Sequence, residues 1–176
     1  MTLDSIGSRR GAVLAERLRG WTVLEAGCGN GIGSAVLDRC AARLTATDKL
    51  PVNVAFASQI YPWLDLRVWD ATEPWPGDRY QAVVAVEVLE HVADPVGLLR
   101  NLFEAAVAEV WFSTPNGLGK PRPPDNPYHV AEYTPVVARE IPPRLPTTAF
   151  GLASEIHARM PAICSEPAED TEPAAV

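Results

Sequence analysis

Residues 80–88, YQAVVAVEV, form an almost continuous apolar run. Such a run is typical of a parallel strand buried on both faces, because helices cover both sides of a parallel sheet. Other apolar runs of strand length occur at residues 21–27, 44–48, 64–70 and 109–115. Between them, stretches whose apolar residues follow helical spacing lie at 31–43, 51–61 and 95–108. This alternation predicts βαβ units with right-handed crossovers, and therefore an α/β fold with a doubly wound, mostly parallel sheet and helices on both faces.

The two ends of the chain add smaller elements. A short amphipathic helix is predicted at residues 11–20 and another at 131–141, and two short strands at 147–154 and 158–165 are expected to pair as a final antiparallel hairpin. The Gly- and Pro-rich stretch 116–129 has the length of a functional lid or binding loop. Residues 1–165 are thus interpreted as one domain. The acidic, Pro-containing tail 166–176 is expected to be disordered, because it has few large apolar side chains.

Composition limits the partners of the chain. The 176 residues carry a formal charge of -7, and neither a basic stripe nor an apolar run of membrane-spanning length is present, so nucleic acid and a membrane span are not expected. Charges throughout the first twenty residues argue against a signal peptide, which makes the cytoplasm the expected location. Three scattered cysteines, Cys28, Cys40 and Cys164, are interpreted as reduced thiols.

The glycine-rich loop EAGCGNGIG, residues 25–33, follows the first predicted strand. In doubly wound sheets a ligand binds outside the carboxyl ends of the strands, and glycines let the backbone approach it closely. The dinucleotide pattern G-x-G-x-x-G fails here, since Ile32 or Ser34 stands at its third glycine in the two registers. The phosphate-binding P-loop pattern fails as well. The loop therefore provides no phosphate cradle and suits a ligand without phosphate, unless it is only a strand-to-helix turn.

The loop, together with the acidic residues that end the second and third strands, resembles the class I S-adenosylmethionine-dependent methyltransferases over residues 20–140. The resemblance implies a Rossmann-like fold. It also implies that Gly27, Gly29 and Gly31 pass under the methionine part of the cofactor, that Asp48 takes the two ribose hydroxyls, and that Asp70 with the Ala71 backbone reads the adenine edge. Taken alone, Asp48 or Asp70 is equally explained as a helix cap or turn residue. The remaining cofactor-binding candidates are Glu25, Cys28, Lys49 and Glu87, and the cationic sulfonium is compatible with Glu25 and Asp48.

Two carboxylates and an imidazole occur together just after the fourth strand, in VEVLEHVADP. Glu87, Glu90 and His91 stand at i, i+3 and i+4, so they share a face if the segment turns helically. In isolation His91 is also explained as a cap or a satisfied polar residue. With STPN at 113–116 and NPYHVAEYT at 126–134, the segment resembles a methyltransferase subgroup that includes ubiquinone-type O-methyltransferases and terminal 2′-O-methyltransferases of small RNAs.

In metal-containing members of that subgroup the paired glutamates, the following histidine and a later histidine hold a divalent ion. The resemblance implies that Glu87, Glu90, His91 and His129 are those ligands here. A mixed set of oxygen and nitrogen ligands suits Mg²⁺, Mn²⁺, Zn²⁺ or Fe²⁺. Two alternatives stay open: His91 or His129 acts as a metal-free general base, or these residues are purely structural.

The resulting hypothesis is S-adenosylmethionine-dependent methyl transfer to a hydroxyl of a small polar acceptor, such as a sugar, phenol or lipid-linked group, with assistance from a metal. RNA 2′-O-methylation is an alternative that the acidic charge disfavours. A third hypothesis is an inactive, cofactor-binding subunit of an active partner, because the first helix is short and no inserted substrate domain is visible. Acceptor capture then falls to the loop at 117–128, to a second copy of the chain or to a partner protein.

Overall fold

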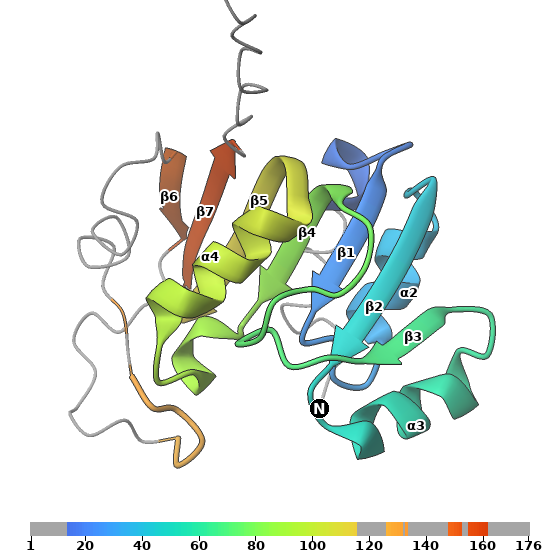
Figure 1. Cartoon of the computed structure of the whole chain (residues 1–176), viewed down its shortest axis with the longest axis horizontal. Coiled ribbons are helices and arrows are strands. Elements are labelled where there is room, and N and C mark those ends of the chain that lie inside the picture. Colours follow the sequence, from blue (N-terminus) through green and yellow to red (C-terminus); the bar gives the residue numbers. More distant parts are fainter. Residues whose placement is uncertain (1–13, 116–125, 132, 134–147, 153–154, 162–176) are drawn as a thin grey trace, which may run out of the picture.

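The computed structural model describes residues 14–115, 126–131, 133, 148–152 and 155–161. A seven-stranded sheet with the order β3-β2-β1-β4-β5-β7-β6 forms its centre (Figure 1). The strands are β1 Thr22–Ala26, β2 Arg43–Asp48, β3 Asp65–Val68, β4 Tyr80–Val86, β5 Ala106–Pro115, β6 Thr148–Leu152 and β7 Glu155–Pro161. The first five pair in parallel, which confirms the predicted doubly wound sheet. Strand order reverses between β1 and β4, so the switch point lies where the glycine loop leaves β1.

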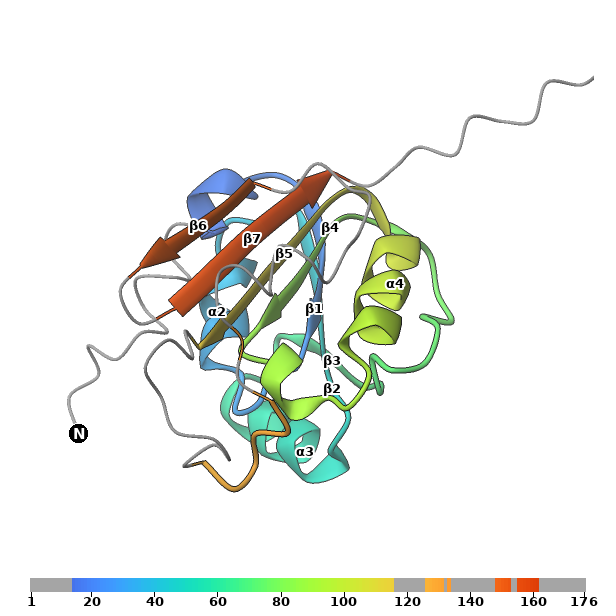
Figure 2. The same ribbon diagram turned by 90° about the vertical axis from the view of Figure 1, so that its left-hand side faces the viewer.

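Three helices connect the parallel strands: α2 Ile32–Asp38, α3 Pro51–Ile60 and α4 Pro95–Ala105. Helix α4 and helix α2 lie on opposite faces of the sheet (Figure 2). Each face has its own buried apolar cluster. One contains Leu98 and Leu102 of α4, and the other contains Leu37 of α2 together with Leu18.

Local sequence explains why α4 begins and packs as it does. The Asp94 carboxylate accepts a hydrogen bond from the Gly97 N–H at 2.9 Å, and Pro95 occupies the first helical turn, where a missing N–H has no cost. Leu98, Leu99, Leu102 and Ala105 are all buried, as the spacing of a single helix face requires. The helix is therefore held against the sheet, and with it the segment between β4 and α4.

Several helices and strands begin or end at other residues than predicted from the sequence. Helix α2 ends at Asp38 rather than at residue 43, because the Cys40 and Ala41 N–H groups both turn back to the Leu37 carbonyl before β2 begins. Strand β3 is shorter than predicted. Residues 14–17 form a helical turn within the range predicted at 11–20. The helix predicted at 131–141 lies outside the described residues except for 131 and 133, as does the tail 166–176.

Beyond β5 the sheet continues with antiparallel strands. Strand β7 pairs antiparallel with β5, and β6 pairs antiparallel with β7. The last strand begins at Glu155, three residues earlier than the predicted 158–165. No helix among the described residues is long and apolar enough to cross a membrane.

Candidate active site

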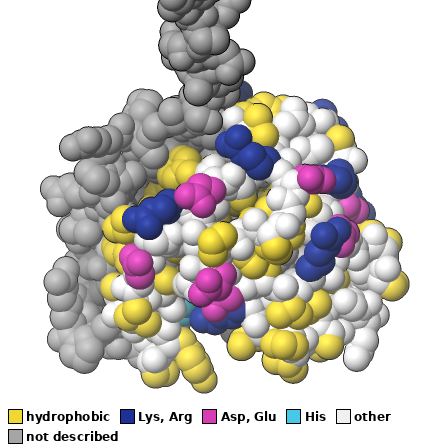
Figure 3. Space-filling view, in the orientation of Figure 1, with side chains coloured by type: hydrophobic (Ala, Val, Ile, Leu, Met, Phe, Trp, Pro, Cys, Tyr) yellow, Lys and Arg dark blue, Asp and Glu magenta, His cyan; other side chains and the backbone are white. Residues whose placement is uncertain are grey.

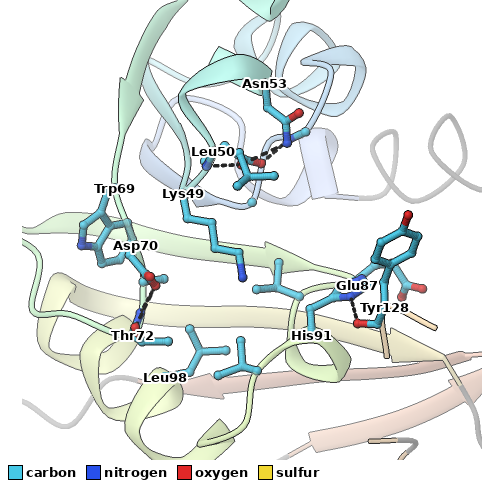
Figure 4. A pocket seen from close by; sticks show the side chains of 16 residues that line it. Lys49, Leu50, Asn53, Trp69, Asp70, Thr72, Glu87, His91, Leu98 and Tyr128 are labelled. Atoms are coloured by element: carbon cyan, nitrogen blue, oxygen red, sulfur yellow. Dashed lines mark hydrogen bonds between the residues drawn. The ribbon is translucent and has the colours of Figure 1, made fainter. Parts of the chain in front are cut away.

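A cavity of about 440 Å³ opens at the carboxyl ends of the parallel strands (Figure 4). It is bordered by the glycine loop after β1, the ends of β2 and β3, the start of α3 and the segment that follows β4. Of the residues singled out in the sequence, the cavity wall contains Gly27, Gly29, Asp48, Lys49, Asp70, Ala71, Glu87 and His91. One cavity therefore joins most of the predicted cofactor residues to the region predicted to receive an acceptor.

The glycine loop is held by the end of β2. The Gly27 and Cys28 N–H groups both donate to the Thr47 carbonyl at 2.8 Å. Gly27 has φ +80°, and a Cβ there would lie 2.5 Å from the Val88 side chain, so only glycine fits. Gly29 has φ +54°, and a Cβ there would meet no protein atom within 4 Å. The wall at Gly29 thus leaves room for a ligand to lie against the backbone.

Asp48 is the polar centre of this wall. Its side chain is buried, and Oδ2 accepts from the Gly29 N–H at 2.9 Å, while Oδ1 accepts from the Leu50 N–H at 2.9 Å and from Asn53 Nδ2 at 3.1 Å. A carboxylate offers about four acceptor positions, so most of its capacity already orients the loop and α3. Asn53 was missed in the sequence. Its place in the first turn of α3, five residues after Asp48, is the only signal that could have indicated it.

Glu25 does not line the cavity. Its buried carboxylate lies beside the start of α2, where Oε2 accepts from the Ser34 hydroxyl at 2.5 Å. Burial raises the pKa of Glu25 to about 7, partly opposed by the Ser34 hydrogen bond. Cys28 and Gly31 also lie off the cavity wall. Burial and the charges of Glu25 and Asp48 raise the pKa of the Cys28 thiol to about 12, so it is a packing residue rather than a reactive thiolate.

The opposite end of the cofactor wall lies at the end of β3. Asp70 Oδ1 accepts from the Thr72 N–H at 3.0 Å and from the Thr72 hydroxyl at 2.8 Å. The Thr72 hydrogen bonds, with a smaller effect from Lys49, lower the pKa of Asp70. Lys49 extends into the cavity between Asp70 and His91 (Figure 4). The Ala71 carbonyl accepts from Asn101 Nδ2 at 3.0 Å, which ties this turn to α4.

Glu87 adopts an unusual backbone conformation for a residue with a Cβ. Its φ is +57°, and its carboxylate Oε1 accepts from the Ser113 hydroxyl at 3.0 Å. The Glu87 N–H also donates to the Ser113 carbonyl at 3.0 Å. Strained backbone of this kind concentrates at functional sites. The contacts to β5 explain why the STPN segment accompanies the glutamate in the sequence.

The segment after Glu87 forms the short 3₁₀ helix η1, Leu89–His91, which brings Glu90 and His91 close to His129. One potential ligand atom from each of these three residues lies within 4.8 Å of the others. The His91 and His129 rings are 5.0 Å apart between centroids, nearly perpendicular. Glu87 is not part of this cluster. The structure therefore brings together three of the four predicted metal ligands and places Glu87 on the cavity wall.

Hydrogen bonds hold the side chains of His91 and Glu90 in place. The His91 Nδ1 lies 2.8 Å from the Tyr128 carbonyl, which can only accept, so Nδ1 carries a proton and the lone pair of the neutral ring lies on Nε2. Glu90 Oε2 accepts from the buried Thr114 hydroxyl at 3.0 Å, and the Val130 N–H donates to the Glu90 carbonyl at 2.7 Å. Burial, reinforced by the charge of Glu87, raises the pKa of Glu90.

The parallel sheet, with this cavity at its switch point, is Rossmann-like, and the sequence comparison gives the family. Residues 6–133 match the family model described as a methyltransferase domain, and the chain belongs to that family. A "Probable S-adenosylmethionine-dependent methyltransferase" of Mycolicibacterium smegmatis is 33% identical over 144 residues, which are 78% of this chain and 54% of that protein. A ubiquinone biosynthesis O-methyltransferase of Methylobacterium sp. is 38% identical over 91 residues, 49% of this chain and 36% of that one.

Solved structures agree on the fold. The N-methyltransferase NodS from Bradyrhizobium japonicum, in complex with S-adenosyl-L-homocysteine, superimposes with a TM-score of 0.68 at 19% identity, covering 91% of this chain and 89% of that one. The chain spans only about a third to a half of the length of the curated relatives it matches. The class I methyltransferase fold and family are thereby confirmed, and the acceptor is not.

Proposed function

We propose that the chain catalyses S-adenosylmethionine-dependent methyl transfer to a hydroxyl of a small polar acceptor. The observation that carries this proposal is that one cavity has both sets of residues in its wall: the glycine loop, Asp48 and Asp70 on one side, and His91 and Glu87 on the other. The similarity to ubiquinone biosynthesis O-methyltransferases supports a hydroxyl as the acceptor. The N-methyltransferase likeness is one of fold alone.

The described residues fit the cofactor. A volume of about 440 Å³ lies within the range of small-molecule sites. The open backbone at Gly29 would accommodate the methionine part, Asp48 would offer its remaining acceptor positions to the ribose, and Asp70 would offer Oδ2 to the adenine edge. S-adenosylmethionine supplies an electrophilic methyl group on a sulfonium. Binding and orienting it is the task of these three residues.

His91 is suited to remove the acceptor proton. Its Nδ1–H donates to the Tyr128 carbonyl, so the lone pair that can take a proton is on Nε2. Glu90 Oε1 lies 3.9 Å from Nε2, and a nearby carboxylate stabilises the imidazolium that forms. The acceptor hydroxyl would give its proton to Nε2 as its oxygen takes the methyl group, and the positive charge would pass from the sulfonium to the His91 imidazolium. Since no net charge is created, positioning of the reactants would supply most of the rate gain.

Glu90, His91 and His129 also fit a divalent metal ion. A metal-bound histidine usually donates its other N–H to a carbonyl or carboxylate, and the His91 contact with the Tyr128 carbonyl has this form. A buried carboxylate with two imidazoles suits Zn²⁺, Mn²⁺ or Fe²⁺, and Mg²⁺ less well. Such an ion would lower the pKa of a bound hydroxyl and orient its oxygen. Because it would occupy the lone pair on His91 Nε2, this role is an alternative to that of His91 as the base.

Titration calorimetry with S-adenosyl-L-homocysteine tests the cofactor site. The wild-type chain is expected to bind it, and Asp48→Asn is expected to weaken binding by about 10- to 100-fold, because an amide cannot accept at both positions now bonded to N–H groups. Asp78→Asn, at an exposed position outside the cavity, is the matched control and should bind as the wild type does. Equal affinity of Asp48→Asn and wild type would contradict the site.

Methyl transfer from labelled S-adenosylmethionine to hydroxyl and amine acceptors then tests the reaction. Label on hydroxyl acceptors supports the proposal, and label on amines alone overturns it. Cofactor binding without any transfer to either panel would instead support the inactive-subunit hypothesis. An RNA panel in the same assay tests 2′-O-methylation.

Metal uptake has its own test. We expect His129→Ala to lower the affinity for Zn²⁺ or Mn²⁺ at least about 10-fold in equilibrium dialysis, since it removes one of three ligands. His157→Ala, which changes the remaining histidine of the chain, is the control. Glu87→Gln should leave uptake nearly unchanged if three residues bind the metal, and should lower it if all four do. Unchanged uptake in His129→Ala would rule the cluster out as a metal site.

A further inference from the structure

Helix α3 presents an apolar face to solvent. Val52, Phe56 and Ile60 are 69%, 51% and 47% exposed. Ala57 is the one buried residue of this helix. Leu50 before the helix and Trp63 after it are also exposed, at 47% and 63%. We call these five residues the α3 apolar face. Figure 3 shows hydrophobic side chains gathered over α3 at the lower edge of the molecule.

The α3 apolar face is a patch rather than a scatter of singly exposed apolar side chains. Val52, Phe56 and Ile60 follow one another at intervals of four residues, so they form one stripe about 12 Å long on the helix. With Leu50 and Trp63 the exposed apolar surface is on the order of 500 Å², a size at which surface patches are often functional. Two such faces together bury on the order of 1,000 Å², which reaches the lower limit of a specific interface.

The distribution of charge indicates which molecule covers the α3 apolar face. Residues 50–64 contain no Asp, Glu, Lys, Arg or His, in a chain whose formal charge is -7. Two copies repel each other over most of their surfaces, and an uncharged face is where they can meet. A lipid surface is disfavoured, because helices that lie on membranes usually carry Lys or Arg beside the apolar stripe. We propose that α3 is the interface of a homodimer, in which the face of one copy packs on the same face of a second.

The spacing of the stripe specifies how two copies pair. In a two-fold symmetric contact the same residues face each other, and antiparallel helices that cross at Phe56 place Val52 of one copy against Ile60 of its partner. Phe56 then lies on the axis beside its own counterpart. The three stripe residues thus form a self-complementary set, with an aromatic anchor at the centre as protein interfaces prefer.

The dimer has a consequence for the cavity. Leu50 and Asn53, at the start of α3, line it, and Asn53 donates to Asp48. A second copy seated on α3 borders the cavity mouth and holds the turn that orients Asp48. The proposed dimer thus places a second subunit at one rim of the cavity.

Sedimentation velocity between about 1 and 100 µM tests the interface. The wild-type chain is expected to dimerise within this range, and Phe56→Glu to weaken dimerisation on the order of 100-fold, because two introduced carboxylates meet in an apolar contact. Val96→Glu is the matched control: it places the same charge at an exposed valine of α4, away from α3, and should dimerise normally. A wild-type monomer at every concentration overturns the proposal, and so does a dimer that survives Phe56→Glu.

A charge-pair experiment separates the interface from misfolding. Val52→Glu alone and Ile60→Lys alone should each weaken the dimer, since each buries an unpaired charge. The double variant Val52→Glu/Ile60→Lys should recover dimerisation, because the antiparallel pairing puts opposite charges against each other twice. Failure of the double variant to recover would contradict the pairing. If the wild-type chain floats with phosphatidylcholine vesicles as a monomer, the proposal is overturned, and the α3 apolar face binds a lipid surface instead.

Discussion

Gly29→Val is expected to abolish measurable binding of S-adenosyl-L-homocysteine, a loss of at least about 100-fold, while the chain still folds. The residue lines the cavity with φ +54°, and the space into which its Cβ would point holds no protein atom within 4 Å. A valine side chain there occupies volume that the cofactor needs, and its branched Cβ is strained at positive φ. Calorimetry measures the loss, and far-ultraviolet circular dichroism checks the fold.

The chain contains a matched control for the strain. Gly20 has φ +77°, and a Cβ added there would also meet no atom within 4 Å, but this glycine precedes β1 at the opposite end of the strand and does not line the cavity. Gly20→Val should therefore lower the melting temperature by an amount similar to Gly29→Val and leave cofactor affinity intact. Equal affinities in the two variants would show that the Gly29 wall is not where the cofactor lies.

The parallel sheet was predictable because its evidence in the sequence is local and repeated. Strands buried on both faces need nearly continuous apolar residues, as in AVVAV before Glu87. Once the strands were placed, Gly29, Asp48 and Asp70 had to meet, because the carboxyl ends of parallel strands share one edge of the sheet. All three residues line the same cavity.

Side-chain direction was less predictable. Glu25 is the last but one residue of β1, next to the glycine loop, yet the alternation of the strand turns its carboxylate toward Ser34 and away from the cavity. Glu87 leaves the cluster of Glu90, His91 and His129 because its positive φ and its bond from Ser113 turn it toward the wall. Both outcomes depend on contacts with residues 9 and 26 positions away, which sequence spacing does not reveal.

The α3 apolar face illustrates a different limit. The sequence PVNVAFASQI predicts a helix, but its apolar residues occur on more than one side, so spacing alone does not say which side packs on the sheet. The structure buries Ala57 and leaves Val52, Phe56 and Ile60 outside. Small residues let the helix approach the sheet closely, and the larger ones remain for a contact with another molecule.

Glu25→Gln is expected to change the pH dependence of stability by up to about 3 kcal/mol. In the folded chain the pKa of Glu25 is about 7, above its ordinary value of 4.5, because the carboxyl is buried. Between these two pKa values the unfolded chain loses the proton and the folded chain keeps it. The wild type therefore loses stability as pH rises from about 5 to 8, by about 1.4 kcal/mol per unit of pKa difference. Glutamine does not titrate, so the variant escapes this loss.

Urea unfolding at pH 5 and pH 8 measures the effect as a difference between the two proteins, in which the titration of every other group largely cancels. The free energy of unfolding of Glu25→Gln, relative to wild type, should be higher at pH 8 than at pH 5. Ser34→Ala provides an independent check, since it removes the hydrogen bond that lowers the pKa of Glu25. In Ser34→Ala the loss of stability with rising pH should continue to a higher pH than in the wild type. The double variant with Glu25→Gln should no longer show this additional loss of stability. A relative stability that stays constant across this pH range would show that the carboxyl is ionised in the folded chain, and that its burial is compensated by a partner other than Ser34.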